Sequence, residues 1–290
     1  MKYPEMNETI PKYALTFPFE DNFNYHATKV MMERFWTRAH YWIAAYLAIV
    51  FSLRGLMKNR RPFHLRKTLA LWNLALAVFS IFGALRTMPE LLHSLSRFGF
   101  AYSACIAAYM EHNKVASFWH WVFVCSKVIE FGDTMFLVLR KRPLTFLHVY
   151  HHVSVLLFCW NTFISCSAPA RWFGVMNFMV HSFMYSYYFA RSLDIRMPKF
   201  VAIAITASQI AQMVMGAFVC TYAFVSKTRG HHCDVGYDEL KLYLAIYLSY
   251  FVLFLRFFYN AYVRGPRSKI PSTPTKEVPE FDERRRFKAE

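Results

Sequence analysis

Seven apolar runs, each long enough to cross a lipid bilayer, constrain the fold of this chain more than any other feature. They lie near residues 40–57, 69–86, 117–139, 144–163, 172–190, 200–225 and 240–262. A helix of about 20 apolar residues spans the hydrocarbon core. The composition agrees, since 56% of the 290 residues are hydrophobic. We therefore predict an all-α, polytopic membrane protein with seven transmembrane helices.

The two ends of the chain differ from this membrane domain, to which we assign residues 36–263. Residues 1–35 mix polar and aromatic side chains and contain no continuous apolar stretch of a cleavable signal peptide. Residues 264–290 carry prolines among charges, a composition that does not bury a core. We expect an N-terminal segment outside the membrane and a disordered C-terminal tail.

The net charge of +16 would suggest nucleic acid as the partner of a soluble protein, but its distribution indicates a membrane topology. Basic residues gather in alternate loops, after the first, third and fifth runs, and in the C-terminal tail. Loops rich in lysine and arginine face the cytosol. With seven spans, the N-terminus is then lumenal and the C-terminus cytosolic, and we expect no nucleic-acid partner.

Three local features fit this topology. Asn7 begins a glycosylation sequon on the predicted lumenal side. Arg286 and Lys288, close to the C-terminus, are typical of a dibasic retrieval signal for the endoplasmic reticulum, although a solvated charge run explains them equally well. Cys105 and Cys233 lie in two lumenal loops, and in that oxidising compartment they can form a disulfide.

Polar residues inside the apolar runs are the candidate functional groups, because ionisable side chains in a bilayer are costly. Four consecutive runs carry them: Lys127, Glu130, Asp133 and Thr134; then His148, His151 and His152; then Asn177, His181, Tyr185 and Tyr188; then Thr206, Gln209 and Gln212. At helical spacing each group occupies one face of its helix. We expect each cluster to point into the bundle.

The depths of these groups in the membrane also agree. Counted at about 1.5 Å per residue from the predicted cytosolic ends, His151 lies about 10 Å deep, and His181 and Glu130 about 14 Å. Gln209 reaches the same level. We therefore predict one buried site that opens toward the cytosol.

Several alternatives remain open at this point. Lys127 and Glu130 could be an ion pair that only orders the bundle, and the glutamines could be interhelical hydrogen-bond partners. The His-x-x-His-His box could serve a metal-dependent membrane lipid oxygenase, although a di-iron centre needs several such boxes and this chain has one. A seven-helix receptor or transporter could use buried polar groups as a relay. Without a metal, a neutral imidazole can act directly as nucleophile, base or acid.

The four clusters together resemble the signatures of the very-long-chain fatty acid elongases, the ELO-type 3-ketoacyl-CoA synthases. The similar segments begin at Lys127, His148, Asn177 and Thr206, in that order. The resemblance implies condensation of an acyl-CoA with malonyl-CoA to 3-ketoacyl-CoA, carbon dioxide and CoA, with no further cofactor or metal. It also implies the endoplasmic reticulum membrane, an enclosed acyl tunnel, and a disulfide between Cys105 and Cys233.

The resemblance further assigns roles to residues of this chain. His151 would carry the acyl group as an acyl-imidazole, His181 would move or orient its proton, and His148 and His152 would complete the catalytic wall. Candidate substrate-binding residues inside the bundle are Lys127, Glu130, Asp133, Asn177, Tyr185, Tyr188, Gln209 and Gln212, several of them donors for developing negative charge. Candidate partners of the CoA phosphates are Lys199, Arg256 and Arg264.

Substrate class and partners are implied more coarsely. Pro143 stands where elongases of polyunsaturated chains often carry Gln, so the chain looks more like the subgroup for saturated and monounsaturated acyl-CoAs. The family's pathway implies the ketoacyl reductase, dehydratase and enoyl reductase as partners in the membrane, and a homo-oligomer is possible.

Overall fold

The structure, a computed structural model, describes residues 11–264, and these contain helices and no β-strand. Asn7, the tail from residue 265 onward and its dibasic pair lie outside the described residues. The α-helices, in chain order, are α1 (Pro18–Asp21), α2 (Tyr25–Arg34), α3 (Trp36–Met57), α4 (Arg66–Cys105), α5 (Ala108–His112), α6 (Lys114–Ile129), α7 (Phe131–Leu139), α8 (Phe146–Ile164), α9 (Ala170–Ser192), α10 (Lys199–Thr228) and α11 (Tyr237–Phe258). A short π-helical stretch, η2 (Tyr259–Val263), extends α11.

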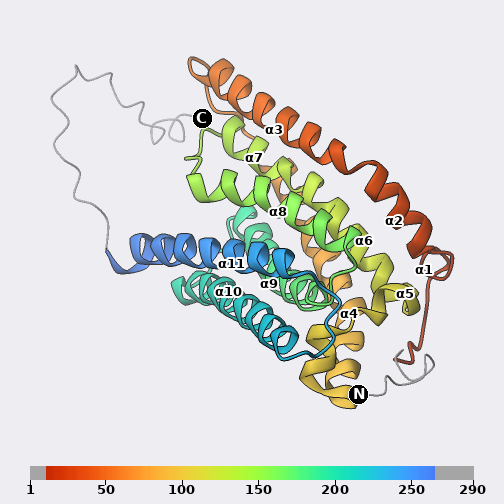
Figure 1. Cartoon of the computed structure of the whole chain (residues 1–290). Coiled ribbons are helices and arrows are strands. Elements are labelled where there is room, and N and C mark those ends of the chain that lie inside the picture. The colour runs from red at the N-terminus through yellow and green to blue at the C-terminus, as the bar shows by residue number, and fades with distance from the viewer. Residues whose placement is uncertain (1–10, 265–290) are drawn as a thin grey trace, which may run out of the picture.

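The long helices pack in a closed ring. Helix α4 packs along α9, α9 against α10, α10 along α11, α11 against α8, α8 against α6, and α6 back against α4. Helix α3 lies outside this ring against α7 and α8, and α2 continues it along the same side of the molecule (Figure 1). A ring of helices leaves an interior axis onto which all of its members can direct side chains.

Within residues 11–264, four helical stretches are long and apolar enough to cross a membrane: Trp36–Met57, Arg66–Cys105, Lys199–Thr228 and Tyr237–Val263. The other three predicted runs also lie on helices, namely α6 with α7, α8, and α9. These three carry the lysine, carboxylates, histidines and asparagine of the polar clusters, which lower their mean hydropathy. They are the helices that bring polar groups to the ring interior.

The predicted run 117–139 is two helices rather than one. Helix α6 ends at Ile129, Glu130 forms a turn, and α7 starts at Phe131. The next glycine, Gly132, lies under the indole of Trp72 on α4, where a Cβ atom would approach the ring to 2.5 Å. The turn changes the helical phase, so residues on either side of Glu130 face different neighbours.

The predicted run 69–86 ends too early. Helix α4 continues through Pro89 to Cys105, with one non-helical residue at Gly99, whose φ is 82°. Glycine adopts this left-handed φ without steric cost. The stretch 87–105, which follows the predicted run, is therefore mostly a continuation of α4.

The two ends of the ring differ in their chemistry. The disulfide end carries the bond between Cys105, after which α4 ends, and Cys233, in the turn between α10 and α11. The histidine end is the opposite one, where α8 begins and α9 ends. Thr145 caps α8 there by accepting a hydrogen bond from the His148 amide at 3.3 Å, which fixes where the histidine box begins.

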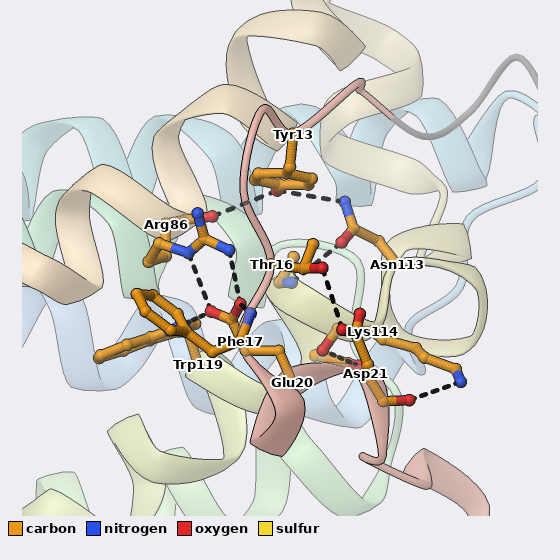
Figure 2. A network of polar contacts seen from close by, with 11 residues as sticks. Tyr13, Thr16, Phe17, Glu20, Asp21, Arg86, Asn113, Lys114 and Trp119 are labelled. Atoms are coloured by element: carbon orange, nitrogen blue, oxygen red, sulfur yellow. Dashed lines mark hydrogen bonds and ion pairs between the residues drawn. The ribbon is translucent and has the colours of Figure 1, made fainter.

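The N-terminal segment fastens α4 to α6 through a fully buried carboxylate (Figure 2). Glu20 accepts hydrogen bonds from Arg86 Nε at 2.8 Å, Trp119 Nε1 at 2.7 Å and the Phe17 amide at 2.9 Å. Tyr13 adds a bond from its hydroxyl to the Arg86 carbonyl at 3.2 Å. Burial raises the pKa of Glu20, but the hydrogen bonds of Arg86, Phe17 and Trp119 outweigh it, and the pKa lies below its usual value.

Candidate active site

The three histidines of the box on α8 do not share one environment. His148 Nε2 lies 2.8 Å from Thr134 Oγ1 on α7, and Thr134 Oγ1 lies 3.0 Å from the hydroxyl of Tyr46 on α3. His152 is 5% exposed and packs against the rings of Tyr46 and Phe131. His148 and His152 thus face α7 and the outer helix α3, while the ring of His152 also lies 5.7 Å from that of His151 and 4.4 Å from that of His148.

His151 is the box histidine that faces the interior of the ring. Its ring meets Tyr250 of α11 edge-on, with centroids 5.0 Å apart. Its Nδ1 is buried and has no hydrogen-bond partner within residues 11–264. A nitrogen that no neighbour occupies is available for chemistry, whereas Nε2 of His148 is held by Thr134.

A narrow cavity runs from His151 along the ring axis. Its lining near the histidine includes Asn177, Gln212 and Tyr250, and its other end is lined by Thr162, Phe173 and His120. On α8 alone the lining extends from His151 to Thr162, about 16 Å of helix. Between these ends the walls are apolar and aromatic, among them Val155, Phe158 and Tyr247, which suits a hydrocarbon chain.

A buried ion pair supports the wall opposite His151. Lys127 Nζ lies 2.7 Å from Glu130 Oε1, and both residues are at most 3% exposed. Ser126 Oγ donates a further hydrogen bond to the same carboxylate oxygen at 3.0 Å. Lys127 also donates to Asn177 Oδ1 on α9 at 3.0 Å. The pair orders the bundle, which was one of the alternatives considered for it. It also orients Asn177, which lines the cavity.

The orientation of Asn177 fixes the tautomer of His181. Lysine only donates hydrogen bonds, so the atom of Asn177 that faces Lys127 is the carbonyl oxygen and the amide nitrogen faces His181. Asn177 Nδ2 then donates to His181 Nε2 at 3.2 Å. The neutral ring therefore carries its proton on Nδ1, which lies 4.0 Å from Glu130 Oε1.

Asp133 and Tyr185, both expected near the site, meet each other at a joint between helices. Asp133 on α7 accepts hydrogen bonds from Trp72 Nε1 of α4 at 2.6 Å and from the Tyr185 hydroxyl of α9 at 2.8 Å. Neither Asp133 nor Tyr185 lines the cavity. The structure thus gives both residues an interhelical role.

The remaining interior candidates divide. Gln212 is buried and lines the cavity, while Gln209 donates from Nε2 to the sulfur of Met184 on α9 at 3.4 Å. Tyr188 is 46% exposed and lies outside the lining. Seven residues after His181, it has the helical phase of that histidine but lies about 10 Å further along α9. The structure therefore does not place Tyr188 where a charge on a bound acyl group would develop.

The three candidate CoA-binding residues lie at the histidine end. Lys199 begins α10, Arg256 lies in the last turn of α11, and Arg264 follows η2; all three are exposed. Within the part of the chain that the structure describes, no group of three or more His, Cys, Asp or Glu side chains could hold a metal ion. The histidine box therefore offers no such ligand set there.

Comparison with known proteins identifies the family. A model of the ELO: GNS1/SUR4 family matches residues 30–270, a range that contains all four polar clusters. The chain is 44% identical over 255 residues to very long chain fatty acid elongase 6 of Drosophila melanogaster, covering 87% of this chain and 81% of that protein. The chain belongs to the ELO family.

Two further relatives agree. The ELO-family chain is 41% identical over 247 residues to very long chain fatty acid elongase 6 of Homo sapiens, covering 85% of this chain and 92% of that protein. It is also 41% identical over 257 residues to putative fatty acid elongase 3 of Caenorhabditis elegans, covering 88% of this chain and 80% of that protein. Together with its apolar helices, this similarity makes the ELO-family chain a multi-pass membrane protein.

Sequence reasoning missed a second polar group of this ELO-family chain, at the disulfide end. Glu90 on α4 and Arg171 on α9 form an ion pair with Nε and Oε2 2.8 Å apart, and both are at most 3% exposed. His120 on α6 is 4% exposed and lines the far end of the cavity. Glu90 lay four residues after the predicted run 69–86, and Arg171 lay one residue before the predicted run 172–190. A charged residue so close to each apolar run was the signal that the sequence offered.

Proposed function

We propose that this chain is the condensing enzyme of fatty acid elongation. It joins a long-chain acyl-CoA to malonyl-CoA and yields 3-ketoacyl-CoA, carbon dioxide and CoA. The observation that carries the proposal is the position of His151 at one end of a narrow apolar cavity. A histidine at the mouth of a hydrocarbon-lined cavity can accept an acyl group whose chain lies within it. The family and the relatives named above support the reaction.

The first step is transfer of the acyl group to His151. A ring nitrogen of His151 attacks the thioester carbonyl, the carbon–sulfur bond breaks, and CoA leaves as a thiolate. The imidazole proton neutralises this thiolate, which leaves a neutral acyl-imidazole. The unpartnered Nδ1 of His151 supports this role, because no neighbouring donor holds it.

The second step forms the carbon–carbon bond. Malonyl-CoA loses carbon dioxide, and the electron pair of the broken bond becomes an enolate. The enolate attacks the acyl carbonyl, the carbon–nitrogen bond breaks, and the imidazole leaves and takes up one proton that comes from water. His181 carries its proton on Nδ1, and its Nε2 accepts a hydrogen bond from Asn177, so His181 is the candidate proton carrier. The positive charge of Lys127 beside Asn177 stabilises developing negative charge.

The proposed membrane arrangement has seven transmembrane helices, with α6 and α7 together as one. The histidine end faces the cytosol and the disulfide end the lumen of the endoplasmic reticulum. CoA then binds at the cytosolic face, where the exposed Lys199, Arg256 and Arg264 are candidate partners of its phosphates. The cavity is the acyl tunnel of this proposal. Reduction and dehydration of the 3-keto product require further enzymes in the same membrane.

The test is a reaction of the purified protein with malonyl-CoA and saturated and monounsaturated acyl-CoAs of increasing length. We expect 3-ketoacyl-CoA and carbon dioxide in equal amounts, at a rate unaffected by chelators. Incubation with acyl-CoA alone should add the mass of one acyl group to the intact protein. Failure to form a 3-keto product from any acyl-CoA overturns the proposal, and iron-dependent oxygen consumption would favour a lipid oxygenase instead.

A further inference from the structure

A second cavity lies at the disulfide end, and its walls are chemically unlike those of the first. Its lining includes Glu90, Arg171, Tyr109 and Thr87. Besides its bond to Glu90, Arg171 donates from Nη1 to the Ser103 carbonyl at 2.6 Å, and its guanidinium lies 4.6 Å from the centre of the Tyr109 ring. Glu90 Oε1 accepts from Ser94 Oγ at 2.9 Å. This polar chamber is therefore built from a paired and buried charge cluster.

One residue, His120, lines both cavities. On α6, Phe123 lines the first cavity and Ala116 the polar chamber, so His120 lies between them along the helix. The distance from His120 to Ala116 is about one helical turn, or roughly 6 Å. His120 thus forms the partition between the apolar cavity and the polar chamber.

The imidazole ring of His120 is wedged in place. It stacks on Phe163 with centroids 6.0 Å apart and an interplanar angle of 13°. Gly174 of α9 lies beside Nδ1, where a Cβ atom would come within 3.4 Å. Phe163 is fully buried and lines neither cavity. The His120 ring is thus flanked by Phe163 on one side and by the backbone of α9 on the other.

Three residues that line the chamber each carry a buried polar atom without a hydrogen-bond partner among the described residues. The atoms are Nη2 of Arg171, the hydroxyl of Tyr109 and Nε2 of His120, and each of these residues is at most 4% exposed. A methyl terminus that entered the chamber would cover these groups without hydrogen-bonding them, which is unfavourable. Besides the His120 ring in front of the chamber, these polar groups thus disfavour the entry of an apolar chain end.

We infer that His120 closes the acyl cavity and sets the longest acyl chain that this enzyme accepts, with the polar chamber as a barrier behind it. The inference rests on the proposed function, because it assigns the substrate's methyl end to the far end of the cavity. Removal of the imidazole joins the two cavities. The opening adds up to about 6 Å of reach, the length of roughly four to five carbons of an extended chain, and the part of it in front of the polar chamber takes two to four.

The test compares kcat/KM of purified wild type and His120→Ala over a series of saturated acyl-CoAs that differ by two carbons. We expect the variant to shift its preference toward chains two to four carbons longer. The ratio of kcat/KM for the longer chain to that for the wild-type optimum should rise about tenfold, as burial of two further methylene groups in the space vacated by the imidazole, in front of the polar groups of the chamber, would give. If His120→Ala does not fold, His120→Val, which also shortens the side chain, is compared with wild type over the same acyl-CoA series.

Two matched variants separate the partition from its surroundings. His120→Phe keeps a ring of similar size, and its chain-length profile should match that of wild type. Phe163→Leu creates space beside the same ring but outside both cavities, and it should also keep the wild-type profile. An unchanged profile in His120→Ala, or the same shift in His120→Phe or Phe163→Leu, overturns the inference. A wild type without any 3-keto product would instead overturn the proposed function.

Discussion

Asn177 donates a hydrogen bond from Nδ2 to Nε2 of His181, one turn further along α9, at 3.2 Å. The bond has a defined direction because the other side of the Asn177 amide accepts from Lys127. Through Asn177, the buried Lys127 on α6 therefore determines which ring nitrogen of His181 on α9 carries the proton. The two histidines of the proposed catalytic pair differ in this respect: His181 is held by neighbours, and Nδ1 of His151 has no hydrogen-bond partner among the described residues.

Replacement of Asn177 by Asp should impair catalysis more than binding. A carboxylate at this position still accepts from Lys127 but no longer donates to His181, so the proton of His181 is free to move to Nε2. We expect kcat to fall on the order of a hundredfold, with little change in KM and a shifted pH–rate profile. Steady-state kinetics over a pH series measures this. An unchanged kcat would contradict the assigned tautomer.

His151→Ala should abolish the covalent intermediate. Mass spectrometry of wild type after incubation with acyl-CoA should show one acyl adduct, and peptide mapping should place it on residue 151. The variant should lack the adduct and lose kcat by at least about a thousandfold. Mapping of the adduct to residue 148 or 152 would contradict the assignment, because these histidines face α7 and α3.

Lys127→Met should destabilise the fold, because it leaves Glu130 buried without its counter-charge. Loss of one partner of a buried pair costs about 3–5 kcal/mol. The double variant Lys127→Met with Glu130→Gln should regain part of this loss, since the unpaired charge is gone. Thermal denaturation in detergent measures both, with Lys67→Met as a control at an exposed lysine of α4. Equal destabilisation in the single and double variants would argue against an unpaired charge as the cause.

Glu20→Gln should lower stability in a pH-dependent way. The pKa of Glu20 is lower in the folded state than its ordinary value of 4.5, so its ionised form stabilises the fold above that value, and the contribution disappears as the pH falls through the folded-state pKa. At neutral pH we expect the melting temperature to fall by roughly 5–10 °C.

The difference between wild type and Glu20→Gln should narrow as the medium is acidified below about pH 4. Glu111→Gln, at an exposed carboxylate on the neighbouring α5, should melt like wild type throughout. A difference that stayed constant with pH would mean that packing, and not the charge of Glu20, holds the N-terminal segment.

Much of this architecture follows from hydropathy and helical period alone. All seven predicted apolar runs lie on helices, and three residues of the predicted clusters, His151, Asn177 and Gln212, line one cavity. Apolar length and polar interruptions are local properties, so a sequence displays them directly. The family motifs then indicated what chemistry such a cavity serves.

What the sequence did not show depends on breaks in that period. Lys127 and Thr134 share a face on an unbroken helix, but the turn at Glu130 separates them, and Thr134 contacts His148 and Tyr46 instead. A turn without proline leaves little trace in composition. The pairing of Glu90 with Arg171 joins residues 81 positions apart, and such a contact depends on how α4 and α9 meet rather than on either segment.

The hydrogen bonds of Glu20 also bear on how the chain assembles. Glu20 is synthesised 66 residues before Arg86 and 99 residues before Trp119. The contact therefore closes only after α3, α4 and the start of α6 have all left the ribosome, and only if they have been threaded in the correct direction. Glu20 can therefore bind both donors only when the first half of the protein is correctly inserted. Truncation past this residue removes that dependence on insertion without removing any residue of the proposed active site.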